Sequence, residues 1–141
     1  MRRISRLLYL IFSWLFVAGV IAQVFLAGMV VVAAQMGWNN HADLGHTLGL
    51  PLLVMLLTAY LGRLPASTKR LTWLLFGVYV LQADVLIFLR DSAPVLSAFH
   101  PVLALADFAL GLTLAWRARG LGVETDEEVE MAGGLQATPG D

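Results

Sequence analysis

The chain has 141 residues, of which 59% are apolar and 13% charged, with a net charge of −1. Its mean hydropathy is +0.78, and soluble domains carry about 25% charged residues, so the composition indicates a membrane protein and excludes a soluble globular domain. There is no cysteine, which excludes disulfides, thiolate metal sites, iron–sulfur clusters and covalent c-type haem attachment.

Four apolar segments follow one another, and each is long enough for a membrane helix, which needs about 20 residues. We predict helices at about 7–35, 41–61, 69–89 and 95–117, which make an all-α, polytopic four-helix transmembrane bundle. The first segment follows a basic start but is longer than the apolar core of a signal peptide, about 7–15 residues, so we expect it to be retained. Pro51 is expected to kink the second helix.

The end of the chain, residues 120–141, differs in composition from the rest. It holds six of the ten acidic residues and no basic residue. Such a composition cannot bury enough apolar surface to fold alone, so it predicts an acidic, disordered cytoplasmic tail.

The basic residues predict the orientation. Eight of the nine Lys and Arg residues fall at the N-terminus, in the 62–70 turn or at the end of the fourth helix, and only Arg90 falls on the other side. By the positive-inside rule both termini are cytoplasmic. We therefore expect a multi-pass protein of the cell (plasma or inner) membrane whose histidines lie near the outer face.

The chain matches itself at an offset of 59 residues. The rare residue types that coincide are Trp14 with Trp73, Gln23 with Gln82, and His41 with His100. This pattern predicts two tandem-repeat hairpins related by a pseudo-two-fold axis along the membrane normal. His41 and His100 should then lie at one depth on diagonal helices.

Two histidines at equivalent depths in a membrane bundle suggest one object bound between them. Gly45 and Ala104 lie one turn beyond His41 and His100, and such small residues would leave room for a flat ligand. Both imidazoles could then bind one haem iron. His46 is the alternative to His41 as the metal ligand. Hydrogen bonding between helices, without a cofactor, would also account for the pair.

Carboxylates inside the third and fourth helices need a partner, a proton or water. Asp107 lies seven residues beyond His100, beneath the predicted haem. Asp84 lies nearer the outer end, where it could orient His46 or meet Arg90. Each carboxylate could accept the proton of an imidazole and so orient that ring. Alternatively, each could take part in a proton path to a quinol or haem site.

Gln23 and Gln82 lie at equivalent depths in the first and third helices. They could bridge helices, or hydrogen-bond the edge of a haem or the carbonyl of a quinone. Arg90 lies at the outer end, where it could pair with a haem propionate.

Three short runs, Gln-Val-Phe-Leu-Ala-Gly-Met-Val, His-Ala-Asp-Leu-Gly-His and Phe-His-Pro-Val-Leu-Ala, resemble one four-helix half of haem A synthase. The chain also resembles a family of uncharacterised small four-helix bacterial membrane proteins. The resemblance covers about residues 10–116 and implies that His41 and His100 are haem ligands. Trp38 stands where the synthase family has glutamate, and Ala42 where it has arginine, so haem hydroxylation is not expected.

These patterns predict a bis-histidine, haem b-binding membrane protein for electron transfer or haem handling. The alternatives are a cofactor-free accessory or structural subunit of a membrane complex, and a small quinone-binding or proton-linked protein. We expect contact with the lipid bilayer and with a redox or membrane-complex protein partner. The sequence has no phosphate-binding loop, no nucleophile paired with a base and no basic nucleic-acid patch, so we predict no catalytic residues and no nucleic-acid partner.

Overall fold

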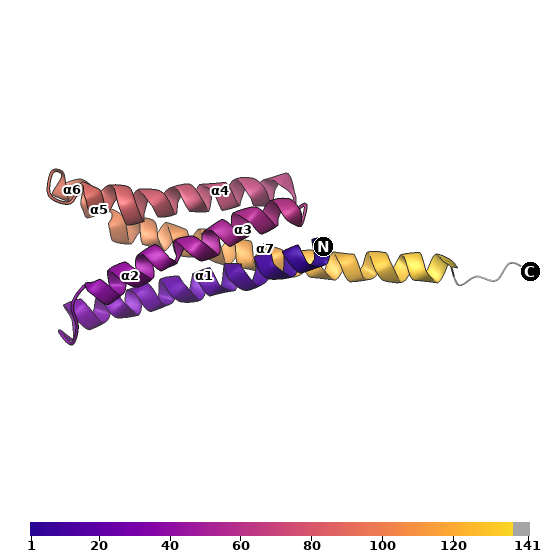
Figure 1. Ribbon diagram of the computed structural model, residues 1–141, viewed down its shortest axis with the longest axis horizontal. Helices are drawn as coiled ribbons and strands as arrows, with labels where there is room; N and C mark the ends of the chain where they lie inside the picture. The colour runs from indigo at the N-terminus through magenta and orange to yellow at the C-terminus, as the bar shows by residue number, and fades with distance from the viewer. Residues whose placement is uncertain (137–141) are drawn as a thin grey trace, which may run out of the picture.

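The computed structural model describes the backbone of residues 1–136 and the side chains of residues 1–120, and within this part of the chain the regular structure is entirely helical (Figure 1). Four spans are long and apolar enough to cross a membrane: Arg2–Val31, Asn39–Leu61, Ala66–Phe88 and Pro94–Gly120. The predicted all-α, multi-pass membrane fold is therefore confirmed.

The first span is one helix, α1 (Arg2–Val31), whereas the second divides into α2 (Asn39–Thr47) and α3 (Gly49–Leu61). The division falls at Leu48, three residues before Pro51. Because proline has no N–H to give to the carbonyl four residues earlier, it interrupts the helical hydrogen bonds at this point.

The third span changes its helical type. It consists of α4 (Ala66–Val80), a π-helix η1 (Leu81–Val85) and a last turn α5 (Leu86–Phe88). The N–H of Leu86 bonds to the carbonyl of Leu81, five residues back. Single π-turns of this kind occur often at functional sites.

The fourth span begins with the short helix α6 (Pro94–Ser97) and continues as α7 (His100–Gln136). The sequence predicted a disordered tail from residue 120, whereas α7 runs on as helix to Gln136 and extends beyond the other helices (Figure 1). Residues 121–136 contain no proline and four glutamates, and a helix that has already started is continued at lower cost than a new one, so the helix continues although the segment also holds three glycines.

The helices pack in a ring. α1 packs against α3 and α7, and α4 packs against the same two helices, so the first and third spans are diagonal, as are the second and fourth. Several fully buried side chains lie towards the end of the bundle that the basic residues predict to be cytoplasmic. They include Tyr9, Phe16, Leu52, Leu75 and Leu114.

The opposite end, which carries the histidines, is loosely packed. In each of the four spans, one buried residue lies nearest to this end. In chain order these residues are Val20, Leu48, Leu86 and Asp107. The two hairpins diverge towards this end (Figure 1), and the described residues beyond those four are half-buried or exposed. The bundle is therefore closed at one end and open at the other.

Candidate functional site

His41 and His100 face each other at the open end of the bundle. The centroids of their rings are 6.2 Å apart and the ring planes are inclined by 69°. Both residues are half-buried, and they come from the first turn of α2 and from the start of α7. The two imidazoles predicted to lie together are thus neighbours.

Each ring is held through its Nδ1 atom. His41 Nδ1 lies 3.1 Å from the backbone oxygen of Gln23, and His100 Nδ1 lies 2.8 Å from that of Gln82. A carbonyl oxygen can only accept, so Nδ1 donates in both cases, and in the neutral ring Nε2 keeps its lone pair. Histidines that bind metals are commonly oriented in this way.

The backbone carbonyls of Gln23 and Gln82 can accept the histidine hydrogen bonds for different structural reasons. At η1 the N–H of Leu86 bonds to Leu81 instead of Gln82, so the Gln82 carbonyl is left for His100. Gln23 lies within the regular helix α1, and its oxygen accepts His41 with a second lone pair. Both contacts span 18 residues, so they recur at the offset of 59, although the origin of the hairpins by duplication stays a prediction.

The spacing of the rings can be compared with that of a shared metal ion. With metal–nitrogen bonds of about 2 Å and a ring centroid about 1 Å behind the nitrogen, two opposed imidazoles have centroids about 6 Å apart. The observed 6.2 Å agrees with this value. An angle of 69° between the rings is compatible with it, because each ring can rotate about its own metal–nitrogen bond.

The space beside His41 is not open as the sequence predicted. A Cβ atom at Gly45 would lie 2.6 Å from the side-chain nitrogen of Gln23, so the Gln23 amide already fills the room that the glycine leaves. Ala104 is half-buried one turn beyond His100. A flat ligand at this level would have to displace the flexible Gln23 side chain.

A layer of unpaired polar atoms lies beneath the histidines. Asp107 is 1% exposed, and neither of its carboxylate oxygens makes a hydrogen bond within the described residues, although the Gln82 side chain lies beside it. The side-chain oxygens of Gln23 and Gln82 are also buried without a partner. The structure therefore joins the helices through the glutamine backbones and leaves these amide oxygens unsatisfied.

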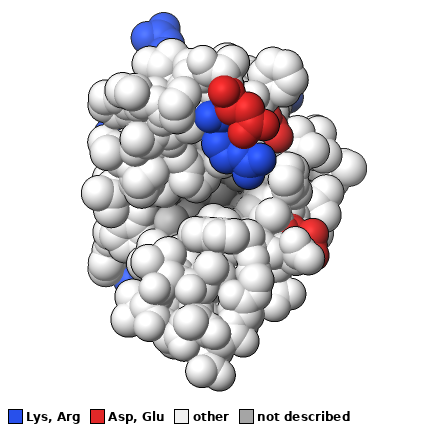
Figure 2. Space-filling view, turned by 90° about the vertical axis from the view of Figure 1, so that its left-hand side faces the viewer, with Lys and Arg blue, Asp and Glu red and all other residues white. Residues whose placement is uncertain are grey.

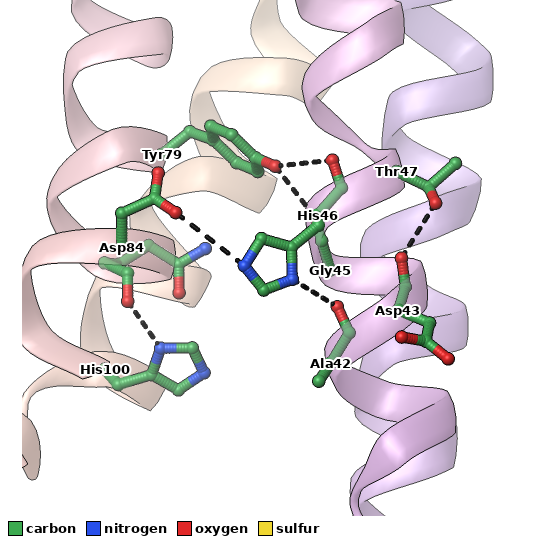
Figure 3. Close-up of polar contacts among 9 residues, drawn as sticks. Ala42, Asp43, Gly45, His46, Thr47, Tyr79, Asp84 and His100 are labelled. Atoms are coloured by element: carbon green, nitrogen blue, oxygen red, sulfur yellow. Dashed lines mark hydrogen bonds and ion pairs between the residues drawn. The ribbon is translucent and has the colours of Figure 1, made fainter. Parts of the chain in front are cut away.

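His46 makes its contacts with Ala42 and Asp84, whereas the ring contact across the bundle joins His41 and His100. His46 Nδ1 donates to the carbonyl of Ala42 at 2.8 Å, and its Nε2 lies 3.8 Å from Asp84 Oδ1 (Figure 3). Of the two partners predicted for Asp84, the structure brings it to His46. Arg90 instead pairs with Asp91 at 3.2 Å, on the exposed surface.

Figure 2 looks onto the histidine end of the bundle, where most of the surface is uncharged. The surface is hollowed there, and basic and acidic side chains lie together beside the hollow.

Among the residues that the structure describes, no three His, Cys, Asp or Glu side chains are grouped closely enough to hold a metal ion.

Two aromatic residues contribute to the site without having been predicted to do so. The ring of Trp38 lies 5.4 Å from that of His41, edge to face. The hydroxyl of Tyr79 lies 2.8 Å from the carbonyl of Gly45 and 3.2 Å from that of His46 (Figure 3), and so ties the third span to the second at its break. A tyrosine inside an apolar helix is the sequence signal that could have indicated such a bond.

The chain is similar to a family of unknown function (DUF6220) over residues 23–86, less than half of its length. The matched segment contains Gln23, His41 and His46 and ends before His100. No curated protein and no solved structure matches the chain.

Proposed function

We propose that this chain is a haem b-binding membrane protein in which His41 and His100 bind the iron from opposite sides. The observation that carries the proposal is their common geometry. Each ring is fixed by an Nδ1–H to a backbone carbonyl, neither Nε2 has a hydrogen-bond partner among the described residues, and the centroids are 6.2 Å apart.

The chemistry of the donors fits this cofactor. Two imidazoles complete the coordination of an iron whose porphyrin supplies the other nitrogens, and bound haem provides a reversible one-electron couple. The open end of the bundle supports insertion of the porphyrin between the hairpins. Arg90 is exposed at this end, where a propionate would compete with Asp91 for its guanidinium.

The proposal places the protein in the cell membrane, with both termini in the cytoplasm and the histidines near the outer face. The support is the positive-inside rule applied to the nine Lys and Arg residues, of which only Arg90 lies at the histidine end. The resemblance to one half of haem A synthase supports the same ligands, and the work we propose is electron transfer or haem handling, for a redox partner or a membrane complex.

A structural role is the second candidate, because the same hydrogen bonds that orient the rings also join helices. His41 links α2 to α1, and His100 links α7 to η1. A cofactor-free accessory subunit would need nothing more from these histidines than interhelical hydrogen bonds of this kind.

The test is the visible absorption spectrum of protein purified after haem-supplemented expression. We expect a haem Soret band in the wild type, its loss in His41→Ala and in His100→Ala, and its retention in His46→Ala. His46 is the matched control, since it is a histidine of the same helix that points elsewhere. Colourless wild-type protein that is otherwise folded would favour the structural role.

A further inference from the structure

A groove on the side of the bundle contains a second, separate histidine–carboxylate pair. Its lining residues are His46, Ala83, Asp84, Val85, Ile87 and Phe88. The side chains of His46 and Asp84 are 68% and 54% exposed, and the neighbouring apolar side chains are exposed as well. In a bundle that crosses the membrane, such a groove faces lipid.

The depth of the pair makes its exposure costly without a ligand. His46 lies seven residues inside the span Asn39–Leu61, roughly 10 Å along the helix. Asp84 lies four residues before the end of the span Ala66–Phe88. Ionisable side chains at such positions are rare and usually functional.

When the His46 ring is neutral and Asp84 is ionised, the two groups face each other as acceptors. His46 gives its Nδ1 hydrogen to Ala42, so in the neutral ring Nε2 presents a lone pair. The nearest oxygen of Asp84 is 3.8 Å from Nε2, too far for a hydrogen bond. A hydroxyl group placed against the pair would supply the hydrogen that it lacks.

Both groups are held in place by the backbone. Tyr79 donates to the carbonyls of Gly45 and His46, and Asp84 belongs to the π-helix η1. Asp84 follows Gln82, the partner of His100, by two residues, and Figure 3 shows His46, Asp84 and His100 in one region. The groove therefore adjoins the histidine site without sharing its imidazoles.

We propose that this groove binds a hydroquinone from the bilayer, with a ring hydroxyl donating to the His46–Asp84 pair. Its flat ring would lie against the apolar side chains of Val85, Ile87 and Phe88. The hydroxyl groups of a hydroquinone are donors, whereas the oxidised quinone offers only carbonyl acceptors, which a neutral His46 and an ionised Asp84 cannot satisfy. The binding does not require haem; only the role of hydroquinone as a redox partner of the haem rests on the proposed function.

The experiment is calorimetric titration of decylubiquinol, under anaerobic conditions, into the detergent-solubilised full chain. Because hydrogen bonds to charged or strongly polar groups contribute most, we expect His46→Phe and Asp84→Leu each to weaken binding about 10- to 100-fold. Asp43→Leu is the control, since Asp43 is exposed on the same helix and its carboxylate points away from His46 (Figure 3). Wild-type affinity in both groove variants would overturn the proposal.

Three further ligands define the chemistry that is recognised. Decylubiquinone, the dimethyl ether of decylubiquinol and a diacylglycerol should all bind more weakly than decylubiquinol. If the dimethyl ether binds equally well, the hydroxyl donor is not what is recognised. If the diacylglycerol binds equally well, the site takes lipid hydroxyls in general and the assignment to hydroquinone is wrong.

The haem proposal is kept separate by repeating the titration with His100→Ala, which cannot supply both axial ligands. Retained binding of decylubiquinol in this variant is expected. Absence of binding in wild-type protein that nevertheless carries haem would overturn the groove alone, whereas hydroquinone binding by colourless protein would overturn the haem site alone.

Discussion

The hydrogen bond on each Nδ1 decides which nitrogen of His41 and of His100 is free for chemistry. Without these bonds either ring could rotate or change tautomer, and the pair would be an unspecific contact between two polar side chains. With them, both Nε2 atoms keep a lone pair at the same level of the bundle. The site is therefore defined as much by the backbone oxygens of Gln23 and Gln82 as by the histidines.

The carboxylate of Asp107 is buried, and within the described residues neither of its oxygens makes a hydrogen bond, although the Gln82 side chain lies beside it. Replacing Asp107 with asparagine keeps the shape of the side chain and removes the free-energy cost of burying a carboxylate in an apolar interior. The new amide can also donate to the buried oxygen of the neighbouring Gln82. We expect Asp107→Asn to raise the free energy of unfolding in detergent by about 1–2 kcal/mol, measured by denaturant titration.

Asp43→Asn is the control for this change, since Asp43 is exposed and should show almost no effect. If Asp107→Asn instead lowers the free energy of unfolding while Asp43→Asn does not, the Asp107 carboxylate is stabilised by a water or a ligand. The polar layer would then be a binding site in its own right.

At the scale of the helices, the irregular positions of the second and third spans coincide with the site. The break at Leu48 lies beside the carbonyls that Tyr79 contacts, and the π-helix η1 frees the carbonyl that His100 uses. Pro51 predicted an irregularity in the second span, because its missing N–H is visible in the sequence. The π-turn had no such signal, since the residues Leu-Gln-Ala-Asp-Val are compatible with an ordinary α-helix.

Packing at the break gives a prediction for two glycines of α1. A Cβ atom at Gly19 would overlap the buried side chain of Leu48, whereas one at Gly28 would meet nothing within 4 Å. We expect Gly19→Ala to lower the free energy of unfolding by about 1–3 kcal/mol through overpacking. Gly28→Ala should leave it unchanged or raise it by up to about 1 kcal/mol through helix propensity.

Both variants are compared by thermal unfolding in the same detergent. Equal midpoints for the two would show that α1 does not approach Leu48 closely. In that case the break at Leu48 would not be packed against the first span at Gly19.

At the scale of the whole molecule, the four spans were predictable because length and apolarity alone decide whether a helix can cross a bilayer. The approach of His41 to His100 followed from the offset of 59 residues. What the sequence could not reveal were tertiary choices: the divergence of the hairpins, the Gln23 side chain beside Gly45, and which of its two predicted partners, His46 or Arg90, Asp84 would approach. Each depends on how whole helices cross, for which an apolar sequence carries little information.

The continuation of α7 to Gln136 is a further difference at this scale. The acidic composition of that segment argues against a packed core but does not oppose a helix that begins inside the membrane and runs on into water. Composition predicted its solvation, whereas the absence of proline up to Gln136 leaves the backbone able to continue the helix.

We propose that two imidazoles bind one haem iron across the open end of the bundle. The most direct test is the electron paramagnetic resonance spectrum of the ferric, haem-loaded protein. We expect a low-spin signal with two imidazole ligands, which becomes high-spin or disappears in His100→Ala. A wild-type spectrum that is high-spin, or a low-spin signal that persists unchanged in His100→Ala, would contradict it.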